Sequence, residues 1–455
     1  MAKKNNNDNL NDNVKGKRGK NEGDNAHKPN WRERYATMAE IEQFLSDHLY
    51  LRRNLVKGCV ECRVPEGDAF AECNLHSPFT THPSPLPTHP SPDSWQRLTD
   101  YQVNSLWRRF KLQKEVLTHD LRQVMESDFV PDFHPMRHYL DHLPPWDGLN
   151  HIMALSTTVC VRGGADEQMR FYLYLRKWLV GMVAAWVDPE VVNHQILVLI
   201  GPQGAYKTTW FSYLLPPELR EYFRIKTNAS RLTKDDLLTL TQYALVCYEE
   251  LDTMSPRDLN ELKSAVTMPS VDERRPYGHY TEHFEHIASF CGTGNNVQFL
   301  SDPTGNRRWL PFQVESITSP RDNPLDYQGI YAEAYALYQQ GFQYWFSPAD
   351  TRRQAEHNRQ FEVPDMLAEI VFRHIRRPSE GETGQFLTTG DIFQMLNANP
   401  SLRLNPNQMG RVMTQLGFER TRCRGMRGYH VVVKSSDEIQ SEKSLMAFDA
   451  KPESG

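Results

Sequence analysis

Residues 201–209 have the residue types, in the right order, to bind the phosphates of a nucleotide. They read GPQGAYKTT, after the apolar run HQILVLI (194–200) and before WFSYLL. Backbone amides of such a turn can surround a phosphate, Lys207 can neutralise its oxygens, and the Thr208 hydroxyl can coordinate Mg²⁺. The pattern therefore predicts a site for ATP and Mg²⁺ formed by Gly201, Pro202, Gln203, Gly204, Ala205, Tyr206, Lys207, Thr208 and Thr209.

Tyr206 departs from the phosphate-binding pattern, which has a glycine before the lysine. A side chain at this position need not block the amides, but the tyrosine ring must find room beside the nucleotide or the adjoining wall. We expect nucleotide binding to survive and leave the rate of hydrolysis open. A chance glycine turn between a strand and a helix is the alternative, and the register of Lys207 disfavours it.

Two carboxylates follow a second apolar run, in YALVCYEELD (243–252). An ATPase needs one carboxylate for Mg²⁺ and another to orient the attacking water. We assign Glu249 to the metal and Glu250 to the water, with Asp252 as an alternative whose register the pattern leaves open. An acidic helix cap would explain the same residues without any chemistry.

A third apolar run ends in polar residues, and a pair of arginines follows it. In IASFCGTGNN (287–296), Asn295 or Thr293 could reach the γ-phosphate or the attacking water. In SDPTGNRRWLPF (301–312), Arg307 and Arg308 are suited to stabilising charge on the nucleotide of a neighbouring subunit. Structural salt bridges are the alternative for the two arginines.

These residues need a sheet whose strand ends bring them together. Strand-like runs alternate with helical patterns between 148 and 320, which is typical of an αβα core with a parallel sheet. The sequence thus predicts an α/β protein with six segments: a disordered tail (1–35), a mixed, mainly helical N-terminal domain (36–147) with a Pro-rich loop (77–93), a P-loop ATPase core (148–320), a helical connector (321–384), a winged-helix DNA-binding domain (385–434) and a second disordered tail (435–455).

The segment 385–434 predicts nucleic-acid binding from its residues alone. TTGDIFQML and NPNQMGRVMTQLG are typical of two helices, and FERTRCRGMRGYHVVV is typical of a two-stranded wing. Between 403 and 434 there are seven Lys or Arg and one acidic residue, an excess suited to binding phosphates. The candidate contacts are Arg411, Arg420, Arg422, Arg424 and Arg427, and a winged helix used only for protein contact is the alternative.

The motifs also carry a resemblance to a known family. GPQGAYKTT, YEELD, DERRPYG, GTGNN and DPTGNRRWLPF, in this order and spacing, resemble the virulence-associated E family of P-loop ATPases. This family is carried by phages and mobile elements and is similar to superfamily 3 and poxvirus-type primase-helicases. HPMRHYLDHLPPWDGLNHI (134–152) resembles its entry segment, the match covers about 115–320, and the chain ends much as some members from Bacteroidetes do.

The resemblance implies an AAA+ type core that assembles as a homo-oligomer, a hexamer. Such a motor translocates on or melts DNA, single-stranded or at a replication fork, together with other replication proteins. It implies an arginine finger at Arg307 or Arg308 and a hairpin within 273–284 that lines the central pore with Arg274, Arg275, Tyr277 and His279, although the hairpin has a purely structural alternative. Residues 36–145 contain no primase signature, so priming is not predicted.

Composition limits the environment and the partners. The 455 residues include 52 Lys and Arg against 57 Asp and Glu, a net charge of −5. Contacts with nucleic acid must therefore come from local basic patches. The N-terminus lacks an apolar secretory segment, and no stretch approaches the roughly 18 apolar residues of a membrane span. We expect a cytoplasmic protein with no membrane partner.

One cysteine and histidine group has spacing compatible with zinc. Cys59, Cys62, Cys73 and His76 could supply four tetrahedral ligands. VKGCVECRV is typical of a strand in which Cys59 and Cys62 need not face the same side, and His76 adjoins the Pro-rich loop. Zinc is therefore an alternative that we do not favour.

The sequence is compatible with three functions. The leading hypothesis is a DNA-dependent ATPase with a helicase-like activity. The second is a nucleotide-gated DNA-binding initiator or regulator in which Tyr206 permits binding but little hydrolysis. The third, a small-molecule kinase, explains the phosphate loop but not the basic C-terminal segment.

Overall fold

The chain divides into two compact units, Met1–Pro135 and Met136–Gly455. The computed structural model describes residues 34–65, 95–227, 234–274, 280–301, 306–379, 381–396 and 406–441, without the side chains of 234–236 and 406–407. Most of the predicted tails and the whole Pro-rich loop 77–93 lie outside these ranges. Within them, no helix is both long and apolar enough to cross a membrane.

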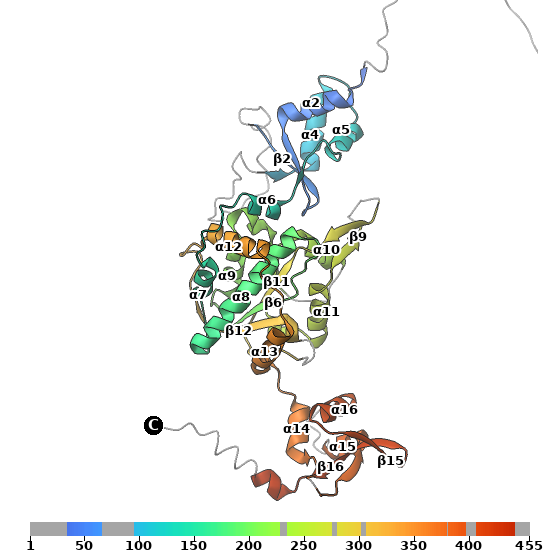
Figure 1. Ribbon diagram of the computed structural model, residues 1–455. Helices are drawn as coiled ribbons and strands as arrows, with labels where there is room; N and C mark the ends of the chain where they lie inside the picture. The colour runs from blue at the N-terminus through green and yellow to red at the C-terminus, as the bar shows by residue number, and fades with distance from the viewer. Residues whose placement is uncertain are drawn as a thin grey trace, which may run out of the picture. The chain divides into compact units, whose positions relative to one another are not determined.

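In the first unit, helices cover one face of a small sheet (Figure 1). The strand order is β3-β2-β1-β4, antiparallel except for the parallel pair β1–β4. Helix α4 begins at a capping box between Thr99 and Gln102, and its buried stripe of Val103, Leu106 and Phe110 follows the helical period. The elements are α2 (Met38–His48), β1 (Tyr50–Asn54), β2 (Cys59–Arg63), β3 (Gln96–Arg97), α4 (Asp100–Lys111), α5 (Thr118–Met125) and β4 (Asp132–Phe133).

The second unit is built on a six-stranded sheet ordered β5-β12-β6-β11-β8-β7. Neighbours from β12 to β7 are parallel, whereas β5 pairs antiparallel with β12 at the edge. Strand β6 is buried along its whole length, as expected for a parallel sheet covered on both faces. The strands are β5 (Val159–Val161), β6 (Ile196–Ile200), β7 (Phe223–Lys226), β8 (Leu245–Tyr248), β11 (Ser289–Gly294) and β12 (Trp309–Ile317).

Helices and one hairpin surround this sheet. The longest helix is α8, whose Trp178 indole donates hydrogen bonds to the carbonyls of Phe290 and Gln195 and so fastens the helix to the sheet. The elements are α6 (Pro135–Asp141), α7 (His151–Thr157), α8 (Gly164–Val187), α9 (Lys207–Leu214), η1 (Pro217–Tyr222), α10 (Lys234–Gln242), η2 (Leu251–Thr253), α11 (Pro256–Val266), β9 (Ser270–Glu273), β10 (Glu282–Glu285), η3 (Asn306–Arg308), α12 (Tyr327–Gln339), α13 (Pro348–Asn358) and η4 (Arg359–Phe361).

Residues 366–434 have a hydrophobic core of their own. Leu367 and Val371 of α14 pack with Ile392, Met409 and other buried residues of the same segment. This core therefore includes α14, which precedes the predicted boundary at 385 and lies within the predicted connector. The elements are α14 (Met366–His374), β13 (Ile375–Arg376), β14 (Gln385–Thr388), α15 (Thr389–Leu396), α16 (Pro406–Gln415), β15 (Arg420–Cys423) and β16 (Met426–Val433).

The chain is a mixed α/β protein, as the sequence predicts. The three apolar runs chosen as strands correspond to β6, β8 and β11, and the segment within 273–284 is framed by the antiparallel pair β9–β10. A predicted disordered tail from 435 is corrected in part, since residues 436–441 form a helical turn. Glu438 in that turn lies 3.6 Å from the guanidinium of Arg376.

Candidate functional site

The loop 201–206 joins the end of β6 to the start of α9. Its first residue is held tightly, because the Gly201 amide donates to the Gly294 carbonyl at 3.1 Å, and a Cβ at Gly201 would lie 3.1 Å from the Val314 carbonyl oxygen. A pocket of about 470 Å³ opens over the loop, within the usual range of small-molecule sites. It is lined by residues 203–209, Glu249, Glu250, Thr293, Gly294 and Asn295.

Tyr206 has a left-handed backbone conformation, with φ 57° and ψ 14°. Its side chain is 46% exposed, so the ring finds room in solvent, at the mouth of the pocket. Gly204 also has a positive φ, of 83°, and the space where its side chain would be is open. Among the described residues, the amides of 204–206 donate no hydrogen bond to the chain. They are therefore available to an anion.

Lys207 begins α9, and its side chain is almost fully buried at 8% exposure. Its ammonium donates to the carbonyls of Gly201 at 2.7 Å and Pro202 at 2.8 Å, and lies 3.4 Å from Asn295 Oδ1. Burial lowers the pKa of Lys207, and the nearby Asp252 carboxylate partly opposes that shift. The cation is thus held at the base of the pocket by neutral oxygens.

Thr208 and Glu249 contact each other directly. The Thr208 hydroxyl donates to Glu249 Oε1 at 2.8 Å, which joins the start of α9 to the end of β8. Glu250 follows in a left-handed conformation, with φ 54°, and its side chain is exposed beside the pocket. A hydroxyl and two carboxylates on one side of the pocket are the kind of oxygen donors that Mg²⁺ takes.

Asp252, the alternative to the two glutamates, contacts the loop that follows β11. Its two carboxylate oxygens accept the backbone amides of Asn295 at 3.2 Å and Asn296 at 3.0 Å. These bonds fix the loop after β11, and with it the Asn295 side chain that approaches Lys207. The sequence offered only a weak signal for this role, namely a carboxylate three residues beyond Glu249.

The strand order explains why these loops meet. β11 lies between β6 and β8, and all three run parallel in matched register, with Gly294 opposite Ile200 and Gly292 opposite Tyr248. Their carboxyl ends therefore reach the same edge of the sheet. Thr293 is buried in β11, whereas Asn295 is exposed beyond it, so Asn295 is the better placed of the two alternatives.

Arg307 and Arg308 lie at the opposite end of the parallel strands, where the strands begin. They precede β12, whose first residue Trp309 pairs with Ile196 at the start of β6. The loop 201–206 follows the end of the same five-residue strand, roughly 16 Å away along the strand direction. Within one chain, the arginine pair and the loop are therefore separated by the length of the sheet.

The turn that carries the two arginines is fixed from behind by α13. Asn358 donates to the carbonyls of Asn306 and Trp309, at 2.9 and 3.0 Å. Burial lowers the pKa of Arg308, and the neighbouring Arg307 adds to the shift. The same two guanidiniums contribute to a lowered pKa of His194, after burial as the main cause. His194 at this edge was not selected from the sequence.

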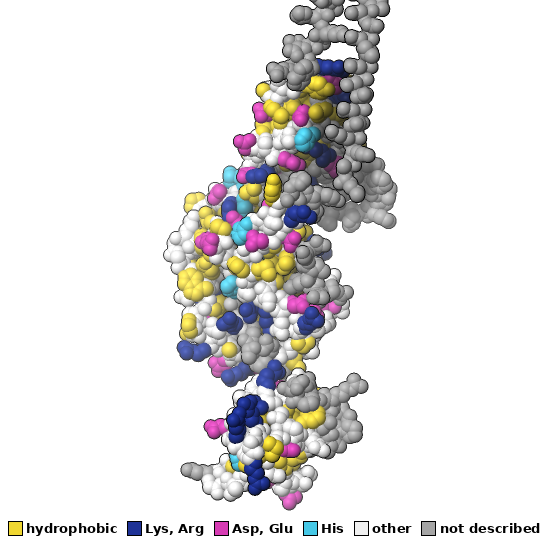
Figure 2. Space-filling model, turned by 90° about the vertical axis from the view of Figure 1, so that its right-hand side faces the viewer, with side chains coloured by type: hydrophobic (Ala, Val, Ile, Leu, Met, Phe, Trp, Pro, Cys, Tyr) yellow, Lys and Arg dark blue, Asp and Glu magenta, His cyan; other side chains and the backbone are white. Residues whose placement is uncertain are grey.

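The residues proposed for nucleic acid fall in two places. Arg274 directly follows β9, while Arg275, Tyr277 and His279 lie outside the described residues. Arg411 is exposed on α16, and Arg420, Arg422, Arg424 and Arg427 are exposed on the β15–β16 hairpin. Lys and Arg side chains gather on the C-terminal part of the chain in Figure 2.

The β15–β16 hairpin carries unneutralised charge. Arg422 lies directly opposite Arg427, and Arg424 adopts φ 48° at the turn. Like charges that face each other across two strands are destabilising. In the described part of the chain, these arginines form no ion pair, which leaves the hairpin suited to an external anion.

The cysteine pair considered for zinc is divided by the sheet. In β2, Cys59 pairs with Asn54 and Cys62 with Leu51, so their side chains lie on opposite faces. Burial raises the pKa of Cys62 to about 11. Cys73 and His76 lie outside the described residues. Among those described, no cluster of three or more His, Cys, Asp or Glu could hold a metal ion.

The chain was compared with curated proteins and with solved structures. No curated protein matches the chain. The apo structure of the NrS-1 C-terminal region (305–718) is 12% identical, covering 87% of this chain and 98% of that chain, with a TM-score of 0.43. Its A form apo structure is 11% identical with the same coverage and a TM-score of 0.42.

The family model for the virulence-associated protein E-like domain matches residues 140–363. The match begins later than the stretch of about 115–320 proposed from the motifs and continues through α13 and η4. It contains the loop 201–209, Glu249, Asn295 and both arginines of η3. Residues 140–363 are therefore a virulence-associated protein E-like domain.

Proposed function

We propose that residues 201–209 form a P-loop that binds Mg·ATP and that the protein hydrolyses it. The observation that carries this proposal is the 2.8 Å hydrogen bond from Thr208 to Glu249 beside the buried ammonium of Lys207. It joins a hydroxyl and a carboxylate, the donors that Mg²⁺ takes in nucleotide sites, next to a cation suited to phosphate oxygens.

The loop supplies most of the charge stabilisation for the phosphates. The amides of 204–206 and the N-terminus of α9 present partial positive charge to the pocket. Lys207 would exchange the carbonyl oxygens of Gly201 and Pro202 for phosphate oxygens. Mg²⁺, held by Thr208 and Glu249, would polarise the same phosphate.

Hydrolysis further requires a water molecule held in line with the phosphate. Glu250 lines the pocket with an exposed carboxylate that can accept a proton from that water. The Asn295 amide can orient the water or the γ-phosphate, because Asp252 keeps its backbone in place. Asp252 therefore acts as a positioning residue, and Glu249, Glu250 and Asn295 are the proposed catalytic groups with Lys207.

The arginines at the far edge of the sheet favour an assembly. Arg307 and Arg308 are remote from the loop of their own chain, yet they form a cationic pair at the start of β12. In a ring of identical subunits related head to tail, two different surfaces of the chain meet at each interface, so the arginines of one subunit can face the loop of the next. We therefore infer a homo-oligomer, a hexamer by resemblance, in which these arginines reach a neighbour's nucleotide.

We assign DNA binding to a C-terminal winged helix. The exposed arginines of α16 and of the β15–β16 hairpin are the support, because Arg422 and Arg427 face each other without an acidic partner in the described residues. Phosphates would relieve that repulsion. Together with ATP hydrolysis, this gives a DNA-associated motor that serves replication of a mobile genetic element.

The proposal is tested by steady-state ATP hydrolysis with and without single-stranded DNA. We expect DNA to stimulate hydrolysis and Lys207→Ala to abolish it, while Lys111→Ala, an exposed lysine of the first unit, leaves it unchanged. Direct measurement of ATP binding accompanies the assay. Absence of ATP binding would overturn the whole proposal, and ATP binding without hydrolysis under any DNA condition would overturn the proposed hydrolysis.

A second candidate is a nucleotide-gated DNA-binding protein with little hydrolysis. The observation that favours it is Tyr206, a bulky residue in a left-handed conformation at the position of the pattern's glycine. Its distinguishing result is ATP binding that changes DNA affinity while no hydrolysis occurs under any DNA condition.

A further inference from the structure

The first unit contains an alternating stack of aromatic rings and arginines. The Arg52 guanidinium lies 3.6 Å from the centre of the Phe133 ring and 4.2 Å from that of Trp95. Arg63 continues the stack, 5.6 Å from the Trp95 ring and 4.9 Å from the Tyr50 ring. We call these five residues the aromatic–arginine ladder. Its residues come from β1, β2 and β4 and from Trp95, which directly precedes β3.

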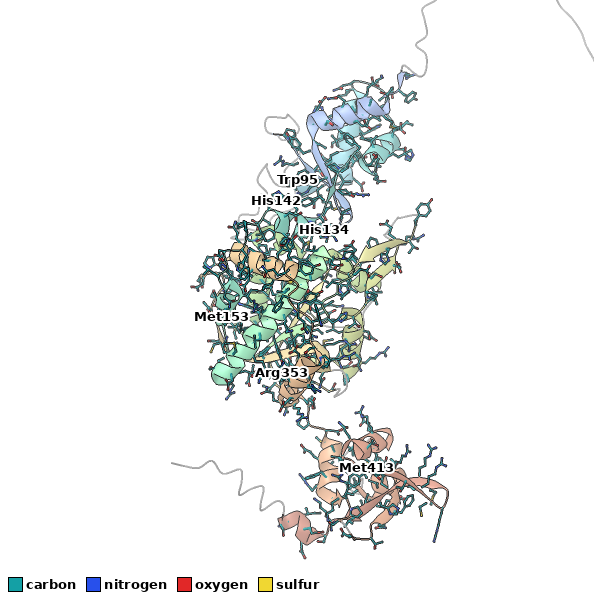
Figure 3. The ribbon with its side chains drawn as sticks, viewed as in Figure 1. Trp95, His134, His142, Met153, Arg353 and Met413 are labelled. Carbon is teal, nitrogen blue, oxygen red and sulfur yellow. The ribbon has the colours of Figure 1, made fainter. Side chains whose placement is uncertain are left out.

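Strand register places the ladder on a single face of the sheet. Tyr50 pairs with Arg63 and Arg52 with Glu61 across β1 and β2, while Phe133 pairs with Asn54 across β1 and β4. The opposite face carries Leu51 and Cys62, which pack with α2, α4 and α5 in the hydrophobic core. In Figure 3, Trp95 lies at the sheet end of this unit, away from α2. The helices thus cover one face and the ladder occupies the other.

The charge of the ladder differs between its two ends. At the inner end, which is the end with Phe133, Arg52 forms two contacts of 2.7 Å with one oxygen of the Glu61 carboxylate. The other oxygen of Glu61 accepts a hydrogen bond from Asn54. At the outer end, Tyr50 is 50% exposed, and Arg63 has no carboxylate partner among the described residues. Arg97, exposed opposite Glu61 on the same face, adds a second cation without an ion pair in that part of the chain.

We propose that this face binds single-stranded nucleic acid. The exposed Tyr50 ring, beside half-buried rings and guanidiniums that have no ion pair among the described residues, matches its two components, because bases stack on aromatic and guanidinium planes while phosphates pair with cations. The inner Arg52–Glu61 pair fixes the ladder, and the outer Tyr50, Arg63 and Arg97 receive a base and its phosphates. This contact is independent of the nucleotide loop and would hold a strand while the proposed motor acts on it.

Photo-crosslinking on the unaltered full chain tests the site directly. The probe is a thymine-rich oligonucleotide of about 12 residues, within the size range of small single-strand sites, carrying 5-iodouracil. It is made as DNA and as RNA, and crosslinked peptides are identified by mass spectrometry. We expect crosslinks to Tyr50 or Trp95 with one or both probes. Crosslinks confined to other regions, with both probes, would overturn the proposal.

Affinity measurements separate this site from the C-terminal arginines. Both proteins compared carry Arg422→Ala and Arg427→Ala, so that the proposed wing contributes little. On this background, Tyr50→Ala combined with Arg63→Ala should weaken binding about 5- to 100-fold, as loss of one stacked base does. Arg108→Ala, an exposed arginine on the helical side of the same unit, is the matched control.

Equal effects of the two changes on the affinity for the oligonucleotide would contradict the proposal, and thermal unfolding of each variant checks its fold. ATP hydrolysis is not involved, so failure here leaves the proposed motor untouched.

Discussion

At the scale of single residues, Tyr206 is where backbone strain and the proposed chemistry coincide. Its φ of 57° lies in the left-handed region, which costs an ordinary residue about 1–2 kcal/mol. Glycine avoids that cost. We therefore expect Tyr206→Gly to be more stable than Tyr206→Ala by about 1 kcal/mol, the reverse of the order at an ordinary helical position. Urea unfolding of the two variants measures the difference.

Substitutions of Thr209 by alanine and by glycine are the control for this comparison, because Thr209 lies in α9, three residues after Tyr206. There, alanine should be more stable than glycine by about 1 kcal/mol. A Tyr206→Ala protein as stable as the Tyr206→Gly protein would show that the loop has no left-handed strain at this position.

Individual roles were predicted unevenly from the sequence. Lys207, Thr208 and Glu249 follow from local motifs, since each sits at a fixed distance from an apolar strand, and the structure brings them together. The sequence does not decide the role of Asp252, because that role depends on which strand lies beside β8. The proximity of His194 to Arg307 depends on the register of β6 and β12, which no local pattern contains.

At the scale of elements, the β15–β16 hairpin should show opposed effects on stability and binding. Replacing Arg422 and Arg427 by alanine removes a repulsive cross-strand pair, so the free energy of unfolding should stay level or rise by a few tenths of a kcal/mol. The same change should reduce the slope of log affinity against log salt by about 2, one for each lost phosphate contact. Fluorescence titrations with DNA at several salt concentrations measure the slope.

Arg373→Ala is the control for the hairpin, because Arg373 is exposed on α14 of the same core. It should leave the salt slope unchanged. If the hairpin variant kept the full slope, the assignment of DNA phosphates to β15–β16 would be wrong.

The contact between α7 and α12 should make stability depend on pH. His151 Nε2 lies 2.9 Å from Asp147 and Nδ1 lies 2.9 Å from Asp326, which caps α12. The bond to Asp147 is the main cause of a raised His151 pKa, with Asp326 and the nearby Glu333 adding to it. Since the folded pKa exceeds the ordinary value of 6.5, this stabilisation is complete below that value and is lost as pH rises through the folded pKa.

We therefore expect His151→Gln to destabilise the protein at about pH 6 and to have less effect at about pH 9, with a difference of a few tenths to about 1 kcal/mol for a contact at the surface. Urea unfolding at both values measures it, with His142→Gln as the control. An equal loss at both pH values would mean that packing, and not charge, holds the two helices together.

The helices and strands could be predicted from the sequence more completely than the pairing between the strands. Apolar runs identified β6, β8 and β11. The antiparallel edge strand β5 and the two-residue strands β3 and β4 carry too few residues for a periodic pattern. For the same reason the aromatic–arginine ladder was not foreseen, because Tyr50, Trp95 and Phe133 are brought together only by strand pairing.

At the scale of the whole molecule, the two ends of the parallel strands carry different parts of the proposed ATPase site. The loop 201–209 follows β6, and Arg307 and Arg308 precede β12, so one chain offers its pocket and its arginines at opposite ends. Each proposed site is then complete only where two subunits meet. Loss of either Lys207 or Arg308 should consequently abolish turnover, and in the proposed assembly the two defects lie on different sides of an interface.

Mixing two inactive proteins tests this arrangement. Lys207→Ala and Arg308→Ala proteins should each be inactive alone, and random co-assembly should restore about one quarter of the wild-type ATP hydrolysis, because about one interface in four joins an intact loop to an intact arginine. The double variant Lys207→Ala/Arg308→Ala, mixed with wild-type protein at matched ratios, is the control for subunit exchange. Should the mixture stay inactive while exchange is demonstrated, Arg308 does not act across an interface, and the separation of the two edges needs another explanation.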